Sequence, residues 1–461
     1  MIYDIAIIGG GSAGLSVAAA AAQFGEKVVL FEKGQMGGDC LNAGCVPSKA
    51  LLAAAKAAQA QRSSAPYGIA AVEPDVDYAK VMDYVQSVIA QIAPHDSVER
   101  FEGLGVRVVR APACFISVRT LEAGGQKYEA RKIVIATGSR AGVPPIPGLK
   151  DVAFLTNETL FQNRVMPKHL IIIGGGPIGM EMAQAHRRLG CEVTVLESQK
   201  ALNKDDPQLS SVVLEALRAE GVVIHEGVAI ESVAKTKVGI AVRLKGEEQI
   251  LGSHLLVAAG RVANVEGLNL EAAGVAYDQR GIHIDRSLRS TNRTVYAAGD
   301  VAGGLQFTHV AGYHAGLIIR NALFKLPVKN RADIIPWVTY TDPEIAHVGC
   351  AAADAAKVLQ WNFSENDRAQ AESKTKGMIK IMLNRSGVIV GASIVGASAG
   401  ELIAPFVLAV TQKIKIAAFA NLVLPYPTLS EIGKRAAITN YTGLAQKPLT
   451  RRLLGLLKIF G

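Results

Sequence analysis

Cysteine, aromatic residues and long apolar runs are all scarce in this sequence of 461 residues. Five cysteines are an odd number and too few for the disulfide framework of a secreted scaffold, which favours catalytic thiols in a reducing compartment. No apolar stretch reaches the ~18 residues that a membrane-spanning helix needs. The first ten residues lack a basic segment ahead of their apolar run and are interpreted as a first strand, not a signal peptide. These absences together favour a cytoplasmic protein.

Aromatic residues make up only 5% of the sequence, and this scarcity affects how its net charge of +9 is interpreted. A nucleic-acid interface is typically a basic patch with interleaved aromatic side chains, whereas the basic residues here are scattered. We therefore expect no nucleic-acid partner. With 49% hydrophobic and 19% charged residues, the composition is typical of a globular protein, and the length allows several domains.

A glycine-rich loop follows the first apolar run, residues 3–9. It is formed by Gly9, Gly10, Gly11, Ser12, Ala13 and Gly14. An alanine-rich helical stretch leads from it to Phe24, and a second strand, residues 27–31, ends at Glu32, 18 residues after Gly14. Glycines for a tight turn and an acid placed to bond a ribose hydroxyl are the fingerprint of a dinucleotide-binding βαβ unit. Its helix N-terminus favours the pyrophosphate, because free N–H groups and the helix dipole attract anions.

The same pattern occurs a second time. Residues 169–173 enter a loop containing Gly174, Gly176 and Gly179, and a strand over 192–196 ends at Glu197, again 18 residues after the last motif glycine. We therefore expect a second bound dinucleotide. An acid at this strand end accepts a hydrogen bond from a ribose 2′-hydroxyl and repels a 2′-phosphate, which favours NADH over NADPH.

Cys40 and Cys45 lie close together in the stretch from Met36 to Ala50, with glycines before them and Pro47 after. On an ideal helix, Cα atoms five positions apart are roughly 8.6 Å from each other, whereas a disulfide needs less than about 7 Å. A bridge would require a distorted backbone, for which Gly44 and Pro47 are suitable, and a strained bridge is easily reduced. Taken alone, the pair is equally compatible with two unrelated buried thiols.

The surrounding motifs make the segment resemble the redox-active disulfide motif of the flavoprotein disulfide reductases, which include dihydrolipoyl dehydrogenase, glutathione reductase and mercuric reductase. Three more stretches extend the resemblance: KIVIATGS over 132–139, LVAAGR over 256–261 and TVYAAGDVAG over 294–303. The resemblance implies an α/β fold with two Rossmann-like domains, the NAD domain inserted in the FAD domain, and an α+β C-terminal dimerisation domain. The expected boundaries are 1–145 and 265–330 for FAD, 146–264 for NAD(P) and 331–461 for the interface domain.

The resemblance also assigns cofactor contacts, here to FAD and NAD(H). The FAD residues it implies are Gly9, Gly11, Ser12, Ala13, Gly14, Glu32, Lys33, Gly38, Asp39, Lys49, Ala113, Thr137, Gly138, Asp300 and Thr308. The nicotinamide dinucleotide would be held by Gly174, Gly176, Gly179, Glu197 and Gly260. We expect no metal site.

By the same resemblance, electrons pass from NADH to the flavin and on to the disulfide. Cys45 would lie against the flavin as the charge-transfer thiolate, and Cys40 would be the outer thiol that attacks the substrate. Lys49, paired with Glu181, would serve the negative charge of the reduced flavin. Thiolates are the nucleophiles, so the site must lower the pKa of a thiol.

One position departs from the pattern of the dithiol-reducing members. They carry a catalytic histidine oriented by a glutamate from the dimer interface, whereas this chain has Tyr426 at the histidine position and retains Glu431. A phenol with a pKa near 10 is a poor general base at neutral pH. Tyr426 either contacts substrate or packs at the interface. Mercuric reductases also place a tyrosine there, but no cysteine follows Cys350, so we do not expect efficient mercury reduction.

The sequence therefore predicts an FAD-dependent oxidoreductase, a cytoplasmic homodimer, that moves electrons between NADH and a thiol or disulfide. The alternatives are a diaphorase that reduces a quinone or metal ion, and a non-catalytic flavoprotein that serves a membrane system.

The remaining cysteines, Cys114, Cys191 and Cys350, are expected to be buried small apolar residues. Residues 447–460 are basic and leucine-rich. We expect a final helix packed on its own domain, with contact to a membrane surface or a partner as the alternative.

Overall fold

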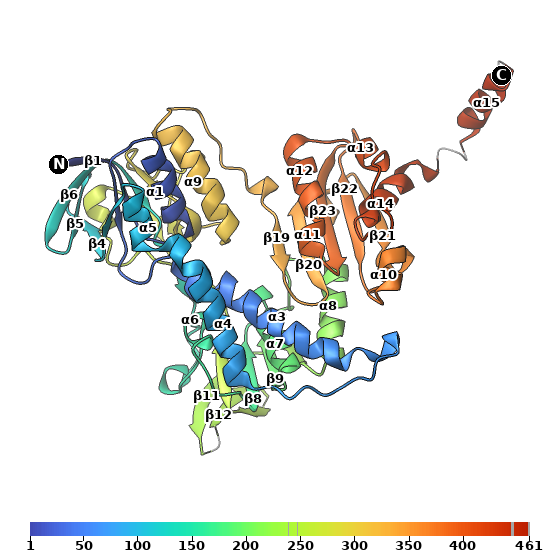
Figure 1. Ribbon diagram of the computed structural model, residues 1–461, viewed down its shortest axis with the longest axis horizontal. Coiled ribbons are helices and arrows are strands. Elements are labelled where there is room, and N and C mark those ends of the chain that lie inside the picture. The colour runs from blue at the N-terminus through green and yellow to red at the C-terminus, as the bar shows by residue number, and fades with distance from the viewer. Residues whose placement is uncertain (238, 247, 444–446, 460–461) are drawn as a thin grey trace. The chain divides into compact units, whose positions relative to one another are not determined.

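The computed structural model describes residues 1–237, 239–246, 248–443 and 447–459. The chain forms two compact units. The first comprises Met1–Ser63, Ala71–Ser198 and His225–Ala332, and the second comprises Ser64–Ala70, Gln199–Ile224 and Asp333–Gly461. Figure 1 traces the elements of each unit.

A parallel sheet forms the core of the first unit, with strand order β3-β2-β1-β6 and β18 beside β6. Two further strands, β5 and β4, continue from β6 in antiparallel fashion. The strands are β1 (Ile2–Ile8), β2 (Val28–Phe31), β3 (Arg107–Val109), β4 (Ala113–Phe115), β5 (Thr120–Ala123), β6 (Gln126–Ile135) and β18 (Val295–Ala297). Since β18 begins 160 residues after β6 ends, the sheet is completed by a distant part of the chain.

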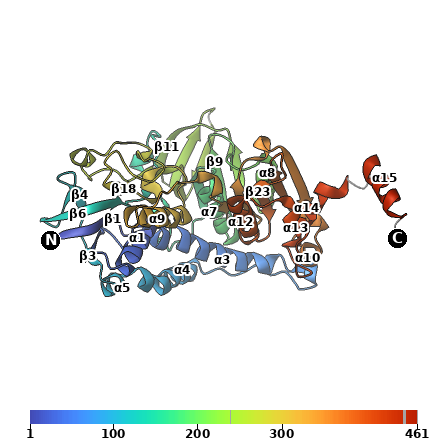
Figure 2. The same cartoon turned by 90° about the horizontal axis from the view of Figure 1, so that it is seen from above.

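Both faces of this sheet are covered. On one face, Ile5, Ile7 and Leu30 pack with residues of α1 (Ser12–Gln23), α5 (Val98–Gly103) and α9 (Thr308–Ala322). Figure 2 shows α1 and α9 side by side. Strand positions alternate between faces, so Ala6, Ile8 and Phe31 point the other way, into a second cluster with β4, β5 and residues 268–282. Burial on both faces explains why these strands are almost continuously apolar.

A second parallel sheet in the same unit runs β9-β8-β14, with β10 beside β9. Its strands are β8 (His169–Ile173), β9 (Glu192–Glu197), β10 (Val223–Glu226) and β14 (His254–Val257), and α7 (Pro177–Arg188) connects β8 to β9. An antiparallel sheet of β11 (Ile230–Thr236), β12 (Gly239–Leu244) and β13 (Gln249–Gly252) contributes to the same hydrophobic cluster. In sequence, this sheet lies between β6 and β18, two adjoining strands of the first sheet.

The helices that carry the cysteine motif also belong to the first unit. They are α2 (Gly38–Asn42) and α3 (Cys45–Arg62), followed by α4 (Tyr78–Ile92). β7 (Ser139–Ala141) and β15 (Arg261–Ala263) form an antiparallel pair that joins the ends of the two parallel sheets. A short helix, α6 (Asn157–Leu160), precedes β8.

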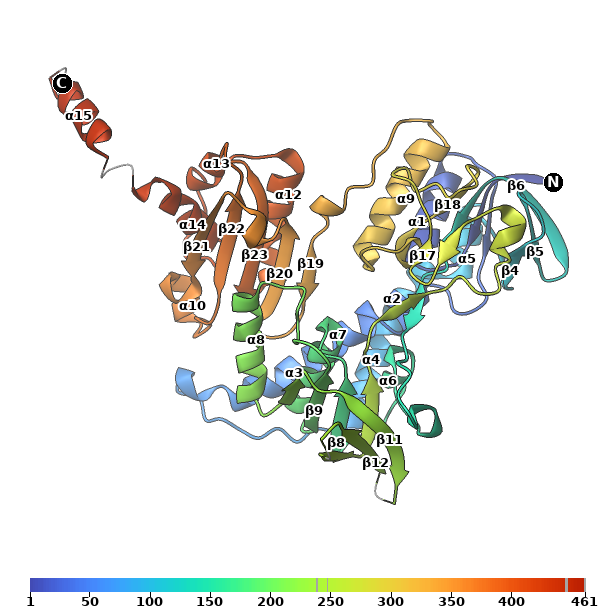
Figure 3. The same cartoon turned by 180° about the vertical axis from the view of Figure 1, so that it is seen from behind.

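The second unit contains an antiparallel sheet of order β19-β20-β23-β22-β21 (Figure 3). Its strands are β19 (Trp337–Thr339), β20 (Glu344–Gly349), β21 (Lys357–Asn362), β22 (Met378–Leu383) and β23 (Ile389–Gly396). One hydrophobic cluster joins the sheet to α11 (Ala399–Leu402), α12 (Ala404–Gln412), α13 (Ile416–Ala420) and α14 (Glu431–Thr442). The unit also includes α8 (Pro207–Ala219) and α10 (Asp367–Ala371). The predicted fold class, Rossmann-like sheets with an α+β C-terminal part, is confirmed, while the exact domain boundaries stay a prediction.

The last described helix, α15 (Pro448–Leu457), corrects one expectation. None of its residues, all of which the structure describes, is buried. The prediction that this segment packs on its own domain is therefore wrong for residues 447–459, and Phe460 lies outside the described residues. Within the described ranges, no helix combines the length and the apolar character needed to cross a membrane.

Candidate active site

The two motif cysteines lie on either side of a break between two helices. Cys40 belongs to α2, and Cys45 is the first residue of α3. Ala43 and Gly44 between them leave helical geometry, with φ of −144° and −128°. This is the backbone distortion that a bridge between positions five apart requires. Both cysteines are free thiols in this structure, so the geometry is that of the dithiol form.

The surroundings of the pair make its two thiols unequal. Hydrogen bonding from Cys40, hydrogen bonding from Thr308 and the positive charge of Lys49 lower the pKa of Cys45 to about 6, although burial opposes the shift. Thr308, the first residue of α9, holds its hydroxyl oxygen 3.2 Å from Cys45 Sγ. The pKa of Cys40 is raised, first because it is hydrogen-bonded to Cys45 and then because of burial. Cys45 is therefore the thiolate of the pair near neutral pH, and Cys40 keeps its proton.

One turn further along α3, Lys49 forms an ion pair with Glu181 of α7. The distance from Lys49 Nζ to Glu181 Oε2 is 2.9 Å, and the two side chains are 38% and 6% exposed. A buried carboxylate requires such a partner, since an unpaired charge is costly to remove from water. The pairing expected from the sequence is present and holds the ammonium close enough to favour the Cys45 thiolate.

The first glycine loop fits the pyrophosphate of a dinucleotide. Gly14, in the first turn of α1, lies so close to Gly9 that a Cβ added to it would be 1.9 Å from the Gly9 carbonyl oxygen. Gly11 precedes α1 and provides no side-chain cap in the described structure, so the first N–H groups of the helix are left for an anion. The Glu32 carboxylate accepts hydrogen bonds from the N–H groups of Gly10 and Gly34, at 2.6 and 2.5 Å, which fixes the acid at the strand end.

The second loop repeats this geometry. Gly179 lies against Gly174, where an added Cβ would be 2.0 Å from the Gly174 carbonyl oxygen. Gly176 precedes α7, again without a side-chain cap in the described structure, and Glu197 accepts a hydrogen bond of 2.6 Å from Gly175. Two loops of the same construction, each at the end of a parallel strand, fit two dinucleotides. Together they agree with the pairing of FAD and a nicotinamide dinucleotide that the resemblance implies.

A polar network that the sequence reasoning missed joins the cysteine motif to both sheets. Arg261 donates to Asp39 Oδ2 at 3.0 Å and to Ser139 Oγ at 2.7 Å. Ser139 Oγ in turn donates to Asp300 Oδ2 at 2.5 Å, and Asn157 donates to Asp39 Oδ1 at 2.7 Å. Burial raises the pKa of Asp300, against the opposing effects of Ser139 and Arg261. Arg261 directly follows Gly260 in the LVAAGR motif, and this position is the feature of the sequence from which its role could have been predicted.

The remaining predicted cofactor residues lie at or near the ends of strands and helices of the first unit. Thr137 and Gly138 form the turn after β6, where Thr137 Oγ1 donates to the Asn264 carbonyl at 2.7 Å. Ala113 is buried in β4, whereas Lys33 is exposed after β2. Gly38 begins α2, and Gly260 ends the turn before β15. Their roles in cofactor binding stay predictions.

Tyr426 and Glu431 belong to the second unit. Tyr426 is 68% exposed, and its hydroxyl donates to Asp367 Oδ2 at 2.9 Å. The hydrogen bond to Asp367 and the charge of Asp367 raise the pKa of Tyr426, so this phenol stays protonated at neutral pH and is less available as a general base than a free tyrosine. Glu431 begins α14 and faces Arg435 at 3.9 Å. Asp367 was not predicted, because it lies 59 residues before its partner.

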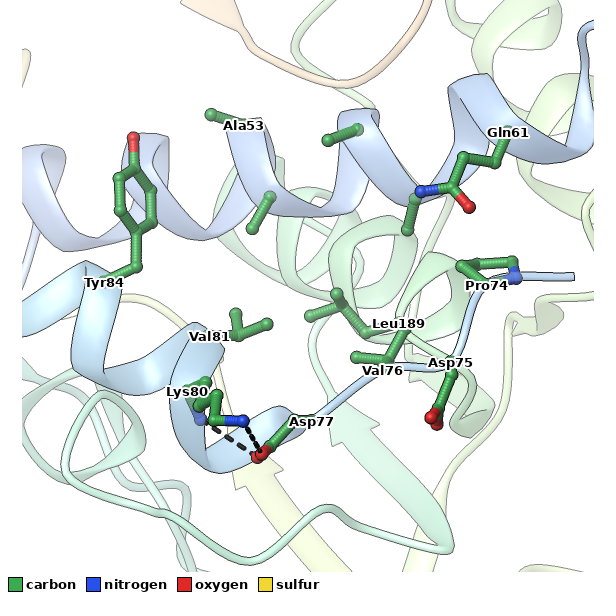
Figure 4. A pocket seen from close by; sticks show the side chains of 13 residues that line it. Ala53, Gln61, Pro74, Asp75, Val76, Asp77, Lys80, Val81, Tyr84 and Leu189 are labelled. Carbon is green, nitrogen blue, oxygen red and sulfur yellow. Dashed lines mark hydrogen bonds and ion pairs between the residues drawn. The ribbon is translucent and has the colours of Figure 1, made fainter.

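Two hollows of the first unit border helix α3. One, of about 400 Å³, is bordered by Cys40, Thr308 and Ser12, and therefore opens onto the thiol that keeps its proton. The other, of about 510 Å³, lies between α3 and α4 (Figure 4). It is lined by Ala53, Ala57, Val81 and Tyr84 among others, and no predicted site residue of the described chain borders it.

The other three cysteines of the described chain do not form a second disulfide or metal site. Cys191 is buried as expected, and burial raises its pKa to about 12. Cys114 and Cys350 are partly exposed, so the expectation of full burial is wrong for these two. Within the part of the chain that the structure describes, no group of three or more histidine, cysteine, aspartate or glutamate side chains is arranged to hold a metal ion.

Comparison with known proteins covers nearly the whole chain. Residues 3–315 match the family described as pyridine nucleotide-disulphide oxidoreductase, and residues 335–437 match the dimerisation domain of that family. A mercuric reductase of Streptomyces lividans is 34% identical over 96% of this chain and 97% of its own length. A dihydrolipoyl dehydrogenase of Bacillus subtilis is 32% identical, covering 96% and 99%. The Cu(II) complex of the HOCl-induced flavoprotein disulfide reductase RclA from Escherichia coli superposes with a TM-score of 0.85 at 25% identity, over 94% of this chain and 99% of that one.

Proposed function

Given that this chain belongs to the pyridine nucleotide-disulphide oxidoreductase family, we propose that it moves electrons between NADH and a thiol or disulfide substrate through Cys40 and Cys45. As a member of this family it is an FAD-containing, NAD(P)H-dependent oxidoreductase that acts on a sulfur group. Bound FAD would serve as the carrier of an electron pair between the nicotinamide and the cysteine pair. The identity of the sulfur substrate class, and the residue roles below, are part of the proposal.

The observation that carries the proposal is the unequal environment of the two thiols. Cys45 has two hydrogen-bonding neighbours and a nearby ammonium, and its pKa is lowered to about 6. Such stabilisation is characteristic of a thiol that works as a thiolate, whereas a structural thiol buried in apolar surroundings has a raised pKa. Cys191 provides that contrast within the same chain.

In the proposed reaction, Cys40 is the thiol that meets the substrate. Its sulfur attacks one sulfur of a substrate disulfide, forming a mixed disulfide and releasing one substrate thiolate. Cys45 then attacks the Cys40 sulfur, which closes the internal disulfide and releases the second substrate thiolate. The proton that Cys40 must lose has an acceptor in the Cys45 thiolate, to which it is hydrogen-bonded, and Cys45 passes this proton to the first released substrate thiolate before it attacks. The cavity beside Cys40 gives the substrate access.

Tyr426 gives this enzyme a different proton chemistry from a member with histidine at that position. Asp367 accepts the hydrogen bond of the phenol and raises its pKa, so the Tyr426 side chain stays protonated at neutral pH and does not act as a general base. We propose that this position contacts the substrate across a homodimer, as the match of residues 335–437 to a dimerisation domain supports. Tyr426→His should then raise dihydrolipoamide turnover, and unchanged turnover would contradict this explanation.

Three further assignments belong to the proposal. Glu197, held at the end of β9 by Gly175, supports a preference for NADH, because its charge repels a 2′-phosphate. The order of the sheets along the chain supports an NAD domain over 146–264 between FAD segments 1–145 and 265–330, followed by an interface domain over 331–461. A working dithiol supports a cytoplasmic location, where thiols are kept reduced.

An anaerobic titration of the holoenzyme with NADH tests the proposal. The expected result is a long-wavelength charge-transfer band together with two new titratable thiols per subunit. Bleaching of the flavin without new thiols would show that the cysteines take no part. Cys40→Ser should keep the band from Cys45 but abolish disulfide turnover. Cys350→Ser, which changes a partly exposed thiol elsewhere, is the matched control and should leave turnover unchanged.

A second candidate is direct reduction of a quinone or metal ion by the reduced flavin, without turnover of the cysteine pair. The similarity to mercuric reductases and the exposed Tyr426 in place of histidine favour it, since metal reduction needs no imidazole to protonate a leaving thiolate. Cys40→Ser separates the candidates: quinone or dye reduction should survive in this variant, and reduction of a disulfide should not.

A further inference from the structure

Helix α15 presents an unusual surface among the described helices of the second unit. Leu449, Leu453, Leu456 and Leu457 are 79%, 56%, 58% and 54% exposed. Exposed leucines gathered on one short helix are costly in water and mark an interaction surface. The helix lies after residue 437, where the match to the dimerisation domain ends.

The spacing of these leucines places them on one face. At about 100° per residue, the four leucines fall within an arc of about 100°. We call these four residues the leucine face. Lys447, Arg451 and Lys458 fall on the opposite side, and Arg452 borders the leucine face. Leu454 points toward the basic side, about 60° beyond the edge of the leucine face.

The charge of the segment indicates what covers this face. Residues 447–458 contain four basic side chains and no acidic one, so the segment carries a charge of +4 within a chain of net charge +9. An apolar face opposed by lysine and arginine is the construction of a helix that lies in the interface of a bilayer, with its leucines among the acyl chains and its cations at anionic headgroups. Arg452, at the border, can extend its charged end to the headgroups while its stem covers apolar surface.

We propose that α15 is a membrane-surface anchor that binds the anionic face of a lipid bilayer through the leucine face and its flanking basic residues. The helix lies in the plane of the interface and does not span the bilayer. This holds the reductase at a membrane surface. The inference rests on α15 alone and does not depend on the reaction proposed for the cysteine pair.

Flotation of the FAD-loaded holoenzyme with vesicles tests the anchor. Vesicles of phosphatidylcholine with one-third phosphatidylglycerol should carry the enzyme to the top of a density gradient, with the flavin absorbance as the readout, and pure phosphatidylcholine vesicles should not. Raising the salt concentration should weaken the binding, because each basic residue contributes about fivefold in affinity through a screened attraction. Equal binding to both kinds of vesicle, or to neither, would overturn the proposal.

Two variants of the same helix distinguish the leucine face from general hydrophobicity. Leu453→Ser with Leu457→Ser should weaken binding to the anionic vesicles roughly a hundredfold, about tenfold for each leucine removed from the bilayer. Leu454→Ser, the matched control on the basic side, should weaken it by less than about threefold. Comparable loss in the control would refute the assignment of the face.

The alternative occupant, a second copy of the chain, has its own signature. If the leucine face joined two copies of the chain, the double variant would have a lower molar mass than the parent enzyme in sedimentation. The parent enzyme would then not bind vesicles, and the membrane proposal would be refuted. The unchanged visible flavin spectrum and melting temperature of both variants would show that they are folded, as expected for a helix in which none of the described residues is buried.

Discussion

The lowered pKa of Cys45 leads to the most detailed prediction, because its causes can be removed one at a time. In order of size, the lowering comes from hydrogen bonding by Cys40, hydrogen bonding by Thr308 and the charge of Lys49. Cys40→Ala should therefore raise the pKa of Cys45 most, Thr308→Val less, and the charge-neutral pair Lys49→Met with Glu181→Gln least. The paired change avoids leaving the buried Glu181 carboxylate without its cation.

The size of the pKa shift of Cys45 determines which assay is informative. A thiol with a pKa of about 6 is ~90% ionised at pH 7, whereas one with a pKa of about 9 is ~1% ionised, so the thiolate population differs by about ninetyfold. A thiolate of lower pKa is also a weaker nucleophile, by about twentyfold over three units at the usual Brønsted slope. The net rate of alkylation at pH 7 therefore changes by only about fourfold. The midpoint of the pH profile moves without this compensation and is the quantity to measure.

The assay is alkylation of the anaerobically reduced enzyme by iodoacetamide across a pH series, with the modified cysteine identified by mass spectrometry. In the parent enzyme, the midpoint for Cys45 should lie near 6. Cys40→Ser is the matched control for Cys40→Ala, because its hydroxyl still donates a hydrogen bond, and its midpoint should rise less. A midpoint that stays near 6 in Cys40→Ala, or that rises most in the Lys49 and Glu181 pair, would refute this account of the site.

Three other predictions concern the framework of the site. Arg261→Gln should destabilise the holoenzyme to urea by about 2–4 kcal/mol, because it leaves the partly buried carboxylates of Asp39 and Asp300 without their shared cation. Arg140→Gln, at the exposed pair with Glu266, should cost less than about 1 kcal/mol. Gly14→Ala should lower the free energy of unfolding by about 3 kcal/mol or more and impair FAD retention, since its Cβ would meet the Gly9 carbonyl oxygen. Gly316→Ala, with no described atom within 4 Å of the added Cβ, should be neutral or stabilising when both variants are compared by thermal melting. Glu197→Gln keeps a hydrogen-bond acceptor but removes the charge, so the ratio of kcat/KM for NADH over NADPH should fall roughly tenfold in steady-state assays, and an unchanged ratio would contradict the role given to Glu197.

The sequence determined those features of the protein that depend on neighbours along the chain. The strand over 169–173 and its glycine loop were predicted within a residue, because apolar runs and the steric demands of glycine act locally. The need for a backbone break between Cys40 and Cys45 also followed from helix geometry alone, and the break occurs at Ala43 and Gly44. The family resemblance then supplied the pairing of Lys49 with Glu181 across 132 residues, which no local pattern contains.

Only the tertiary structure decided which side chains from distant elements meet. Thr308 reaches Cys45 across 263 residues, Arg261 reaches Asp39 across 222, and Asp367 meets Tyr426 across 59. Such contacts depend on how whole elements pack, and a sequence pattern with a period of two or 3.6 residues carries no information about them. The exposure of α15 was decided in the same way. An amphipathic helix has the same pattern whether its apolar face is buried against the protein or left for another surface, and only the packed structure distinguishes the two.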